Sequence, residues 1–381
     1  MPDRLKAFMR RRAINKCSSM ERLGLAKFVL YEDMDGKVYD VNLPLTCNVD
    51  PAELRQNLGI PDYVDLDYFP MKSAMVTLWA SMNAPTLQKQ YPQAFEKQIN
   101  NKPIPALLFG GAAIKIQCQS SNGKGPLARS IKDTDFIVPK KVGINFYKMM
   151  LGLGKAFGTM FTSFATSNDR RFNTWRYGER YRLTTINGIT REGEPTLTVM
   201  DLFCDRINLR HRVEIKDIGL FERYMENLYT VGLEGLLLSK GQFIFDMPAE
   251  TREDLKQKGQ EYRILQYPFF AKDRVIIGME EKDLKDVAAI FLDHEIGKGG
   301  GKIDAQMMRK AFEKDNKLAL SVSLNIKNLA EHQEILDIWL SKSEISTVTD
   351  RIETLFKELP KVDKKWEKPW WDTEVETPVI E

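Results

Sequence analysis

The chain has 381 residues, more than one domain usually holds, and this length predicts two domains. Its 56 lysines and arginines are balanced by 53 aspartates and glutamates. The formal charge of +3 excludes a polycation that binds nucleic acid through bulk charge, so any contact with nucleic acid needs local basic patches.

The metal-binding and redox-active residues are few and scattered. No CxxC pair occurs among the cysteines, so neither a disulfide framework nor a structural zinc site is expected. Unpaired cysteines of this kind predict a reducing, cytoplasmic location. With only three histidines, a metal site would have to use carboxylates. No apolar run reaches the roughly 20 residues that a membrane span needs, so no membrane association is expected.

The first hundred residues are predicted to be mainly helical, with one helix starting at Pro51 behind an Asp50 cap and another over 69–83. A short apolar strand over 106–109 then stops at Gly110-Gly111 and precedes a helix over 112–119. The next predicted elements are strand 135–138, helix 143–164, strand 181–185 and strand 196–203.

From about residue 219 the hydrophobic spacing is helical, with helices expected over 220–232, 233–245, 280–294, 304–317, 326–342 and 344–359. The glycine-rich segment 297–301 is interpreted as a linker, because its spacing does not fit a P-loop. The tail contains three tryptophans and is expected to be extended, either docking a partner or packing on its own domain. The predicted fold class is α+β: a mixed sheet with flanking helices, followed by a helical C-terminal domain.

Asp133 and Asp135 are the first candidates for chemistry. In an extended segment, residues two apart point to the same face, so these carboxylates can converge on one hard cation such as Mg²⁺. Upstream, the Gly110-Gly111 doublet lies at a strand-to-helix turn. Glycines there let backbone N–H groups approach phosphates closely, helped by the helix N-terminus.

Asp201 is the candidate third carboxylate. It lies within an apolar alternating strand, where an unpaired charge would be costly. A third carboxylate would complete a two-metal clamp for phosphoryl transfer. Asp205, at the end of the same strand, is the reserve candidate.

These motifs together resemble the nucleotidyltransferase superfamily, which has the DNA polymerase β-like fold. The resemblance is strongest to the AbiEii-type abortive-infection toxins of type IV toxin–antitoxin systems, and it covers residues 100–295. This chain departs from the family pattern by an alanine after the glycine doublet, by Ile131 where a hydroxyl is usual, and by a longer loop over 121–125. The motifs that carry the resemblance are Leu108-Phe109-Gly110-Gly111-Ala112-Ala113-Ile114, Arg129, Asp133-Thr134-Asp135, Leu236-Leu237-Leu238-Ser239-Lys240 and Lys282-Asp283-Leu284-Lys285-Asp286-Val287.

The resemblance implies a catalytic core over 101–218, between a mainly helical region 1–100 and a helical domain 219–360, with a charged tail over 361–381. It implies a catalytic set of Asp133, Asp135, Asp201, Lys240 and Asp283, in which the first three bind Mg²⁺ or Mn²⁺. The implied nucleotide-binding residues are Gly110, Gly111, Arg129 and Lys240. Asp286 and Lys272-Asp273 compete with Asp283 for its place.

A second candidate patch lies in 168–182, where arginines alternate with aromatic residues. Arginine makes bidentate contacts with phosphate, and aromatic rings stack on unpaired bases. The weaker RNA-binding candidates are therefore Arg170, Arg171, Trp175, Arg176 and Arg180. A solvated hairpin with aromatic packing accounts for the same pattern nearly as well.

The sequence thus predicts a Mg²⁺-dependent enzyme that transfers NMP from an NTP to an acceptor. By resemblance the first acceptor is RNA, such as the tRNA 3′ end, and a cognate antitoxin is an implied partner. A protein acceptor, a small-molecule acceptor of the antibiotic-modifying type, and a non-catalytic nucleic-acid- or partner-binding protein are the alternatives.

Overall fold

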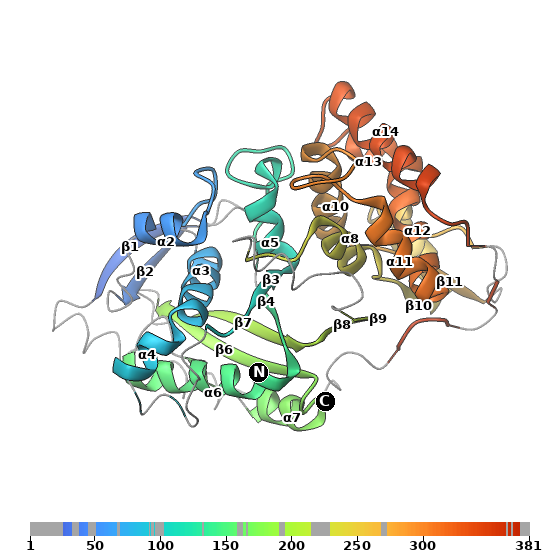
Figure 1. Cartoon of the computed structure of the whole chain (residues 1–381). Helices are drawn as coiled ribbons and strands as arrows, with labels where there is room; N and C mark the ends of the chain where they lie inside the picture. Colours follow the sequence, from blue (N-terminus) through green and yellow to red (C-terminus); the bar gives the residue numbers. More distant parts are fainter. Residues whose placement is uncertain are drawn as a thin grey trace. The chain divides into compact units, whose positions relative to one another are not determined.

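The computed structural model describes residues 26–32, 38–44, 51–66, 69–90, 92, 95, 103–131, 133–157, 163–164, 167–189, 195–214, 229–267, 273–362, 365–366 and 369–373. The chain is mixed α+β (Figure 1) and divides into two compact units. Unit 1 comprises Met1–Ala112, Ser130–Asp205 and Tyr224–Thr230. Unit 2 comprises Ala113–Arg129, Arg206–Arg223 and Val231–Glu381.

Unit 1 opens with an antiparallel hairpin of β1 (Ala26–Glu32) and β2 (Val38–Pro44). This hairpin was not predicted for a region expected to be mainly helical. Helices α2 (Pro51–Leu58) and α3 (Phe69–Met82) confirm the two predicted helices, and the short α4 (Ala84–Gln90) follows them.

The main sheet of unit 1 has the strand order β3-β4-β7-β6-β5. Only the central β4–β7 pair is parallel, so the sheet is mixed, as predicted. The strands are β3 (Leu107–Phe109), β4 (Asp133–Val138), β5 (Ser163–Phe164), β6 (Arg180–Ile189) and β7 (Pro195–Cys204).

Helices α6 (Lys140–Phe157) and α7 (Ser167–Trp175) pack against strands of this sheet. The predicted helix 143–164 was too long, because Ser163 and Phe164 pair with β6 as the edge strand. Gly143 gives α6 its close approach to β7, since a Cβ at this position would lie 2.5 Å from the Cys204 Sγ. On the same face of the sheet, Tyr147 of α6 stacks on Tyr181 of β6 with ring centroids 5.1 Å apart.

Unit 2 contains most of the helices of the second half of the chain, together with two hairpins, β8–β9 and β10–β11. A purely helical C-terminal half was therefore a wrong prediction. The elements are α5 (Gly110–Gln117, whose first turn belongs to unit 1), β8 (Arg206–Asn208), β9 (Arg212–Glu214), α8 (Leu233–Gly241), β10 (Phe245–Pro248), α9 (Thr251–Gln257), β11 (Arg274–Ile277), α10 (Glu281–Asp293), α11 (Ala305–Lys314), α12 (Asn316–Glu331), α13 (Gln333–Leu336) and α14 (Lys342–Glu358).

The predicted helices 280–294, 304–317 and 344–359 are confirmed as α10, α11 and α14. Two others had wrong limits. Helix 233–245 ends at Gly241, because Phe245 pairs with Ile277 in the β10–β11 hairpin. The predicted helix 326–342 corresponds to parts of α12 and α13. Asp315 caps α12, so this helix begins at Asn316, ten residues before the predicted start.

Predicted helix 220–232 falls mostly outside the described residues, and Thr230 at its end forms a parallel bridge to Leu108. The segment 297–301 is a loop between α10 and α11, closed by a bridge between Ile296 and Ile303. No helix within the described ranges is both long and apolar enough to cross a membrane.

The tryptophan-containing tail packs on unit 2. Trp370 and Trp371 are 3% and 7% exposed in a cluster with Ile244, Leu265, Ile276 and Leu320. The Trp370 Nε1 donates a hydrogen bond of 3.0 Å to the Ser321 Oγ. Of the two uses considered for the tail, packing on its own domain is the one that the structure shows for these residues.

Candidate functional site

The glycine doublet and the two aspartates of β4 meet in unit 1. β3 pairs with β4 so that Phe109 lies opposite Asp135, and the chain turns into α5 at Gly110. Gly110 has a φ of +67°, in the left-handed region that favours glycine. A Cβ at Gly110 would lie 2.5 Å from the Asp135 Oδ2. The carboxylate therefore occupies the space that a side chain would fill, next to the N-terminus of α5.

Asp133 and Asp135 point to one face of the sheet, since residues two apart in a strand share a face. Asp133 is exposed and Asp135 is half-buried, whereas Thr134 between them is fully buried on the opposite face. This part of the predicted site has the expected local arrangement: two carboxylates on one face, beside a glycine turn.

Asp201 lies directly opposite Asp135 in the parallel register of β4 and β7. Its carboxylate accepts hydrogen bonds from two arginines of β6, with Arg182 Nε 2.7 Å from Oδ1 and Arg182 Nη2 2.7 Å from Oδ2. Arg180 Nη2 also lies 2.5 Å from Oδ2. Burial raises the pKa of Asp201, but Arg180 and Arg182 outweigh it and lower the pKa. The carboxylate expected to bind metal is thus ionised and engaged by arginines.

A protein-only metal centre is absent from the described part of the chain, where no group of three or more His, Cys, Asp or Glu side chains is placed to hold an ion. Mg²⁺ needs no such cage, because it is often bound by one or two carboxylates together with phosphate oxygens and water. A cation at Asp133 and Asp135 would therefore need further oxygen ligands from outside the described side chains.

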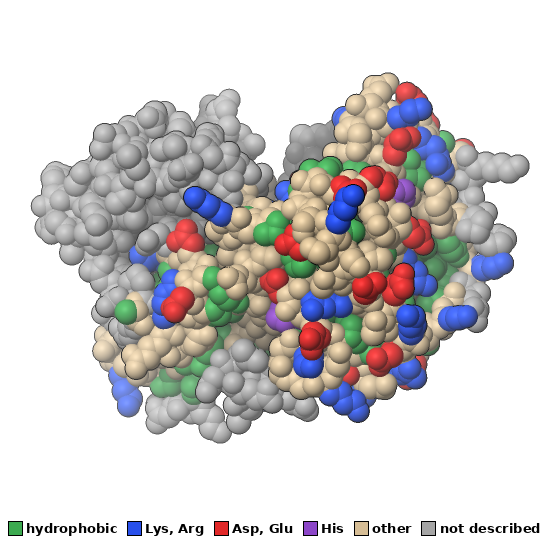
Figure 2. Space-filling view, turned by 90° about the horizontal axis from the view of Figure 1, so that it is seen from above, with side chains coloured by type: hydrophobic (Ala, Val, Ile, Leu, Met, Phe, Trp, Pro, Cys, Tyr) green, Lys and Arg blue, Asp and Glu red, His purple; other side chains and the backbone are tan. Residues whose placement is uncertain are grey.

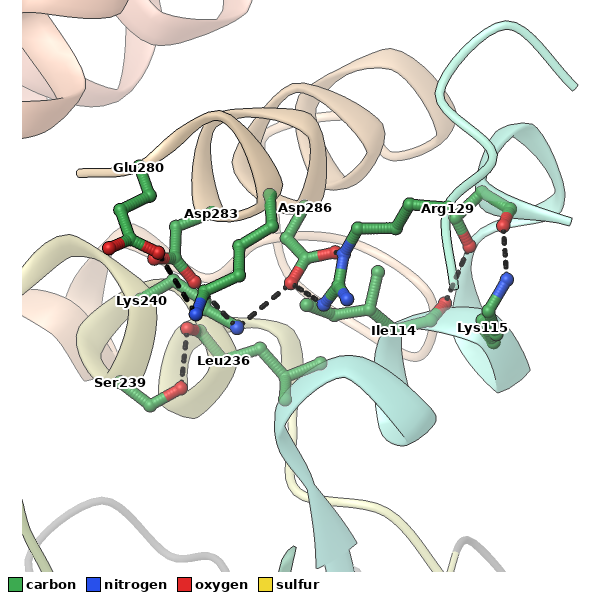
Figure 3. A network of polar contacts seen from close by, with 11 residues as sticks. Ile114, Lys115, Arg129, Leu236, Ser239, Lys240, Glu280, Asp283 and Asp286 are labelled. Carbon is green, nitrogen blue, oxygen red and sulfur yellow. Dashed lines mark hydrogen bonds and ion pairs between the residues drawn. The ribbon is translucent and has the colours of Figure 1, made fainter. Parts of the chain in front are cut away.

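The remaining predicted catalytic residues lie in unit 2, in a buried network of Arg129, Lys240, Asp283 and Asp286. Figure 3 shows Lys240 between the two carboxylates, with its Nζ 2.8 Å from Asp283 Oδ1 and 2.9 Å from Asp286 Oδ2. Arg129 donates to both oxygens of Asp286, at 2.7 Å through Nε and 2.5 Å through Nη2. Two positive and two negative charges thus balance within this unit 2 network.

Burial by itself lowers the pKa of Lys240, but Asp283 and Asp286 outweigh it and raise the pKa above its ordinary value. Burial raises the pKa of Asp286, whereas Lys240 and Arg129 bring it below its ordinary value. Lys240 and Asp286 therefore stay charged at neutral pH. Asp283 and Asp286, which the sequence left as competitors, both contact Lys240. The partnership of Arg129 with Asp286 was not predicted, because 157 residues separate them.

The basic and aromatic residues of 168–182 separate into two groups. Arg170 and Arg171 on α7 are exposed, and Trp175 at its end is 49% exposed, with the half-buried Arg176 guanidinium 3.9 Å from the Trp175 ring centroid. Arg180 is buried, with its guanidinium 4.1 Å from the centroid of the Phe203 ring and bonded to Asp201. The assignment of Arg180 to RNA binding is therefore corrected: its guanidinium is used inside unit 1.

Charges of both signs are mixed on the face of the molecule seen from above. In the space-filling view, Lys and Arg side chains alternate with Asp and Glu side chains (Figure 2). This distribution agrees with the small net charge of +3.

No protein-family model matches the chain, and no curated protein or solved structure is significantly similar to it.

Proposed function

We propose that unit 1 carries a Mg²⁺-dependent nucleotidyltransferase site. The observation that supports this most directly is the contact between Gly110 and Asp135, which joins the glycine turn to the carboxylate pair. A phosphate-binding turn and cation-binding carboxylates at one point suit the chemistry of a metal–triphosphate complex. The motif resemblance to the AbiEii-type toxins supports the same reaction.

In the proposed reaction, a hydroxyl oxygen of the acceptor bonds to the α-phosphorus of the NTP. The bond from that phosphorus to the α,β-bridging oxygen breaks, pyrophosphate leaves with the electron pair, and the hydroxyl proton passes to solvent. Backbone N–H groups at Gly110 and Gly111 would hold the phosphates, and Asp133 and Asp135 would hold the cation. Bound Mg²⁺ would stabilise negative charge on the phosphoryl oxygens.

The proposed acceptor is RNA. Exposed Arg170, Arg171 and Trp175 supply phosphate-binding and base-stacking groups on one helix of unit 1. The narrower proposals, a tRNA 3′ end as acceptor and a cognate antitoxin as partner, rest on the resemblance alone.

The test is incubation of the full chain with Mg²⁺, each α-labelled NTP and total RNA, followed by separation on a denaturing gel. We expect label on RNA, reduced about 100-fold by Asp133→Ala, which removes an electrostatic contribution to the transition state. Asp62→Ala is the matched control, because Asp62 is an exposed carboxylate of the same unit. Label on neither RNA nor protein from any NTP would refute the proposed activity.

The resemblance also assigns Lys240 and Asp283 to the nucleotide, and we keep this as a separate proposal. An ammonium has three donors, and Asp283 and Asp286 take two of those of Lys240. Lys240→Arg keeps the charge but changes the donor geometry. Weaker NTP binding with an unchanged unfolding temperature would support the assignment, and unchanged binding would refute it.

A further inference from the structure

Three neighbouring strands of unit 1 place Asp135, Asp201 and Arg182 in one row across the sheet. The parallel register pairs Asp135 with Asp201, and the antiparallel register pairs Asp201 with Arg182. Paired residues share a face, and adjacent strands lie about 4.8 Å apart. The Arg182 Cα therefore lies about 10 Å from the Asp135 Cα on the same face, within reach of a long side chain.

Asp201 fixes the orientation of Arg182. The carboxylate is 3% exposed, and both of its oxygens accept hydrogen bonds from the Arg182 guanidinium. A bidentate pair of this kind holds the planar guanidinium in one orientation. Below it, the Phe172 ring of α7 has its centroid 4.6 Å from the Arg182 Cζ. Arg182 is thus held by a carboxylate at one edge and an aromatic ring on one face.

The two arginines that share Asp201 differ in exposure. The Arg180 side chain is 11% exposed and lies over Phe203, whereas the Arg182 side chain is 27% exposed. The pKa of Arg182 is lowered by burial but raised more by its surroundings, first by Asp201 and then by Asp169 and Asp135. The larger exposed fraction makes Arg182 the more accessible of the two arginines. The proposed metal ligand Asp135 is among the carboxylates that raise its pKa.

We infer that Arg182, oriented by Asp201, binds the triphosphate of the nucleotide whose cation lies on Asp133 and Asp135. This inference rests on the proposed function. The two carboxylates alone would repel the phosphates that are not neutralised by the metal, and a guanidinium in the same row offsets that repulsion. Asp201 then acts as a positioning residue for Arg182 and not as a third metal ligand.

The test is equilibrium binding of NTP to the full chain in saturating Mg²⁺ and without RNA, measured by calorimetry. We expect Arg182→Lys, which loses the planar fork, to weaken binding about tenfold, and Arg182→Met to weaken it about 100-fold. Lys141→Met is the matched control, because it removes one positive charge from an exposed position of unit 1 and should leave affinity unchanged.

Asp201→Asn separates the two roles considered for this carboxylate. As a positioning residue, its loss should raise the KM for NTP while the Mg²⁺ concentration for half-maximal activity stays unchanged. A metal ligand would instead give a several-fold higher Mg²⁺ requirement, and that result would overturn the inference. Arg180→Lys disturbs the contact between Asp201 and its more buried arginine. This variant should change the unfolding temperature more than the affinity for NTP.

Thermal unfolding is measured for every variant, and Arg182→Lys, which keeps the buried charge, decides the outcome if Arg182→Met does not fold. Wild-type binding of NTP together with equal binding by folded Arg182→Lys and Arg182→Met would overturn the inference but leave the proposed function intact. Absence of NTP binding by the wild-type chain would instead overturn the proposed function, and this inference with it.

Discussion

Replacing Lys240 by methionine is predicted to destabilise unit 2 strongly. Lys240 Nζ lies within hydrogen-bonding distance of Asp283 and Asp286, whose side chains are 4% and 3% exposed. Removing one partner of a buried ion pair costs about 3–5 kcal/mol, because a charge is left buried without compensation. Asp286 keeps the bidentate contact with Arg129, so only Asp283 loses its cation. The lower end of that range, about 3 kcal/mol, is therefore expected.

A double-mutant cycle checks the physical reason. In Lys240→Met/Asp283→Asn the charge left behind is removed as well, and the neutral pair of Arg129 and Asp286 remains. The two substitutions should therefore be non-additive by about 1–3 kcal/mol, as for directly contacting charges. The assay is a urea titration read by pulsed hydrogen exchange in peptides of α8 and α10, which reports unfolding of this unit itself.

The pH dependence follows from the signs of the shifts. The lowered pKa of Asp286 gives stability that is present above its unfolded value of about 3.9 and is lost as pH falls through the folded value. The raised pKa of Lys240 gives stability that is present below about 10.4 and is lost as pH rises through the folded value. The cost of Lys240→Met should therefore be constant from about pH 5 to about pH 9. If the effects of Lys240→Met and Asp283→Asn on the free energy of unfolding were additive, the direct ion pair in the unit 2 network would be refuted. A destabilisation by Lys240→Met of less than about 1 kcal/mol would refute it as well.

Three further predictions concern other parts of the chain. Gly110→Ala should abolish transfer activity and cost about 1–2 kcal/mol in thermal unfolding, because its φ is +67° and its Cβ would meet the Asp135 carboxylate; normal activity would show that the turn tolerates a side chain. His211, whose pKa burial lowers to about 4, stays neutral in the folded chain while the unfolded form protonates below about pH 6.5. The free energy of unfolding should thus fall by about 3 kcal/mol from pH 6.5 to pH 4 in urea titrations, and His211→Gln should flatten that slope. Trp370→Ala should lower the free energy of unfolding by about 3–5 kcal/mol in the same urea titration, because it leaves a cavity in a buried cluster and removes the hydrogen bond to Ser321. A decrease below about 1 kcal/mol would show that the tail adds little to the core.

The local parts of the unit 1 site could be predicted from sequence. A glycine doublet after a short apolar run predicts a turn, and aspartates two residues apart in a strand share a face. Both patterns depend on neighbours in the chain, which is why β3, β4 and β7 were placed nearly correctly. The contact between Gly110 and Asp135 needs only the antiparallel pairing of β3 with β4.

The long-range parts could not be predicted. The partners of Asp201 come from β6, and the register that pairs Arg182 with Asp201 is set by tertiary packing. The β10–β11 hairpin was missed for the same reason: Phe245 extends an apolar helical pattern, and its partner Ile277 lies 32 residues further on. The resemblance singled out Lys240 and Asp283, but it did not show that two carboxylates of α10 hold the Lys240 ammonium.

The two charge clusters differ in one respect that bears on function. In the unit 2 network, Lys240 and Arg129 pair with the buried Asp283 and Asp286, so each of these four charges has a partner of opposite sign. In unit 1, Asp201 is likewise paired with Arg180 and Arg182, whereas Asp133 is an exposed carboxylate. Asp133→Ala leaves the buried ion pairs in place, whereas a substitution of Lys240 disturbs them, and Asp133→Ala is therefore the more direct test of nucleotidyl transfer.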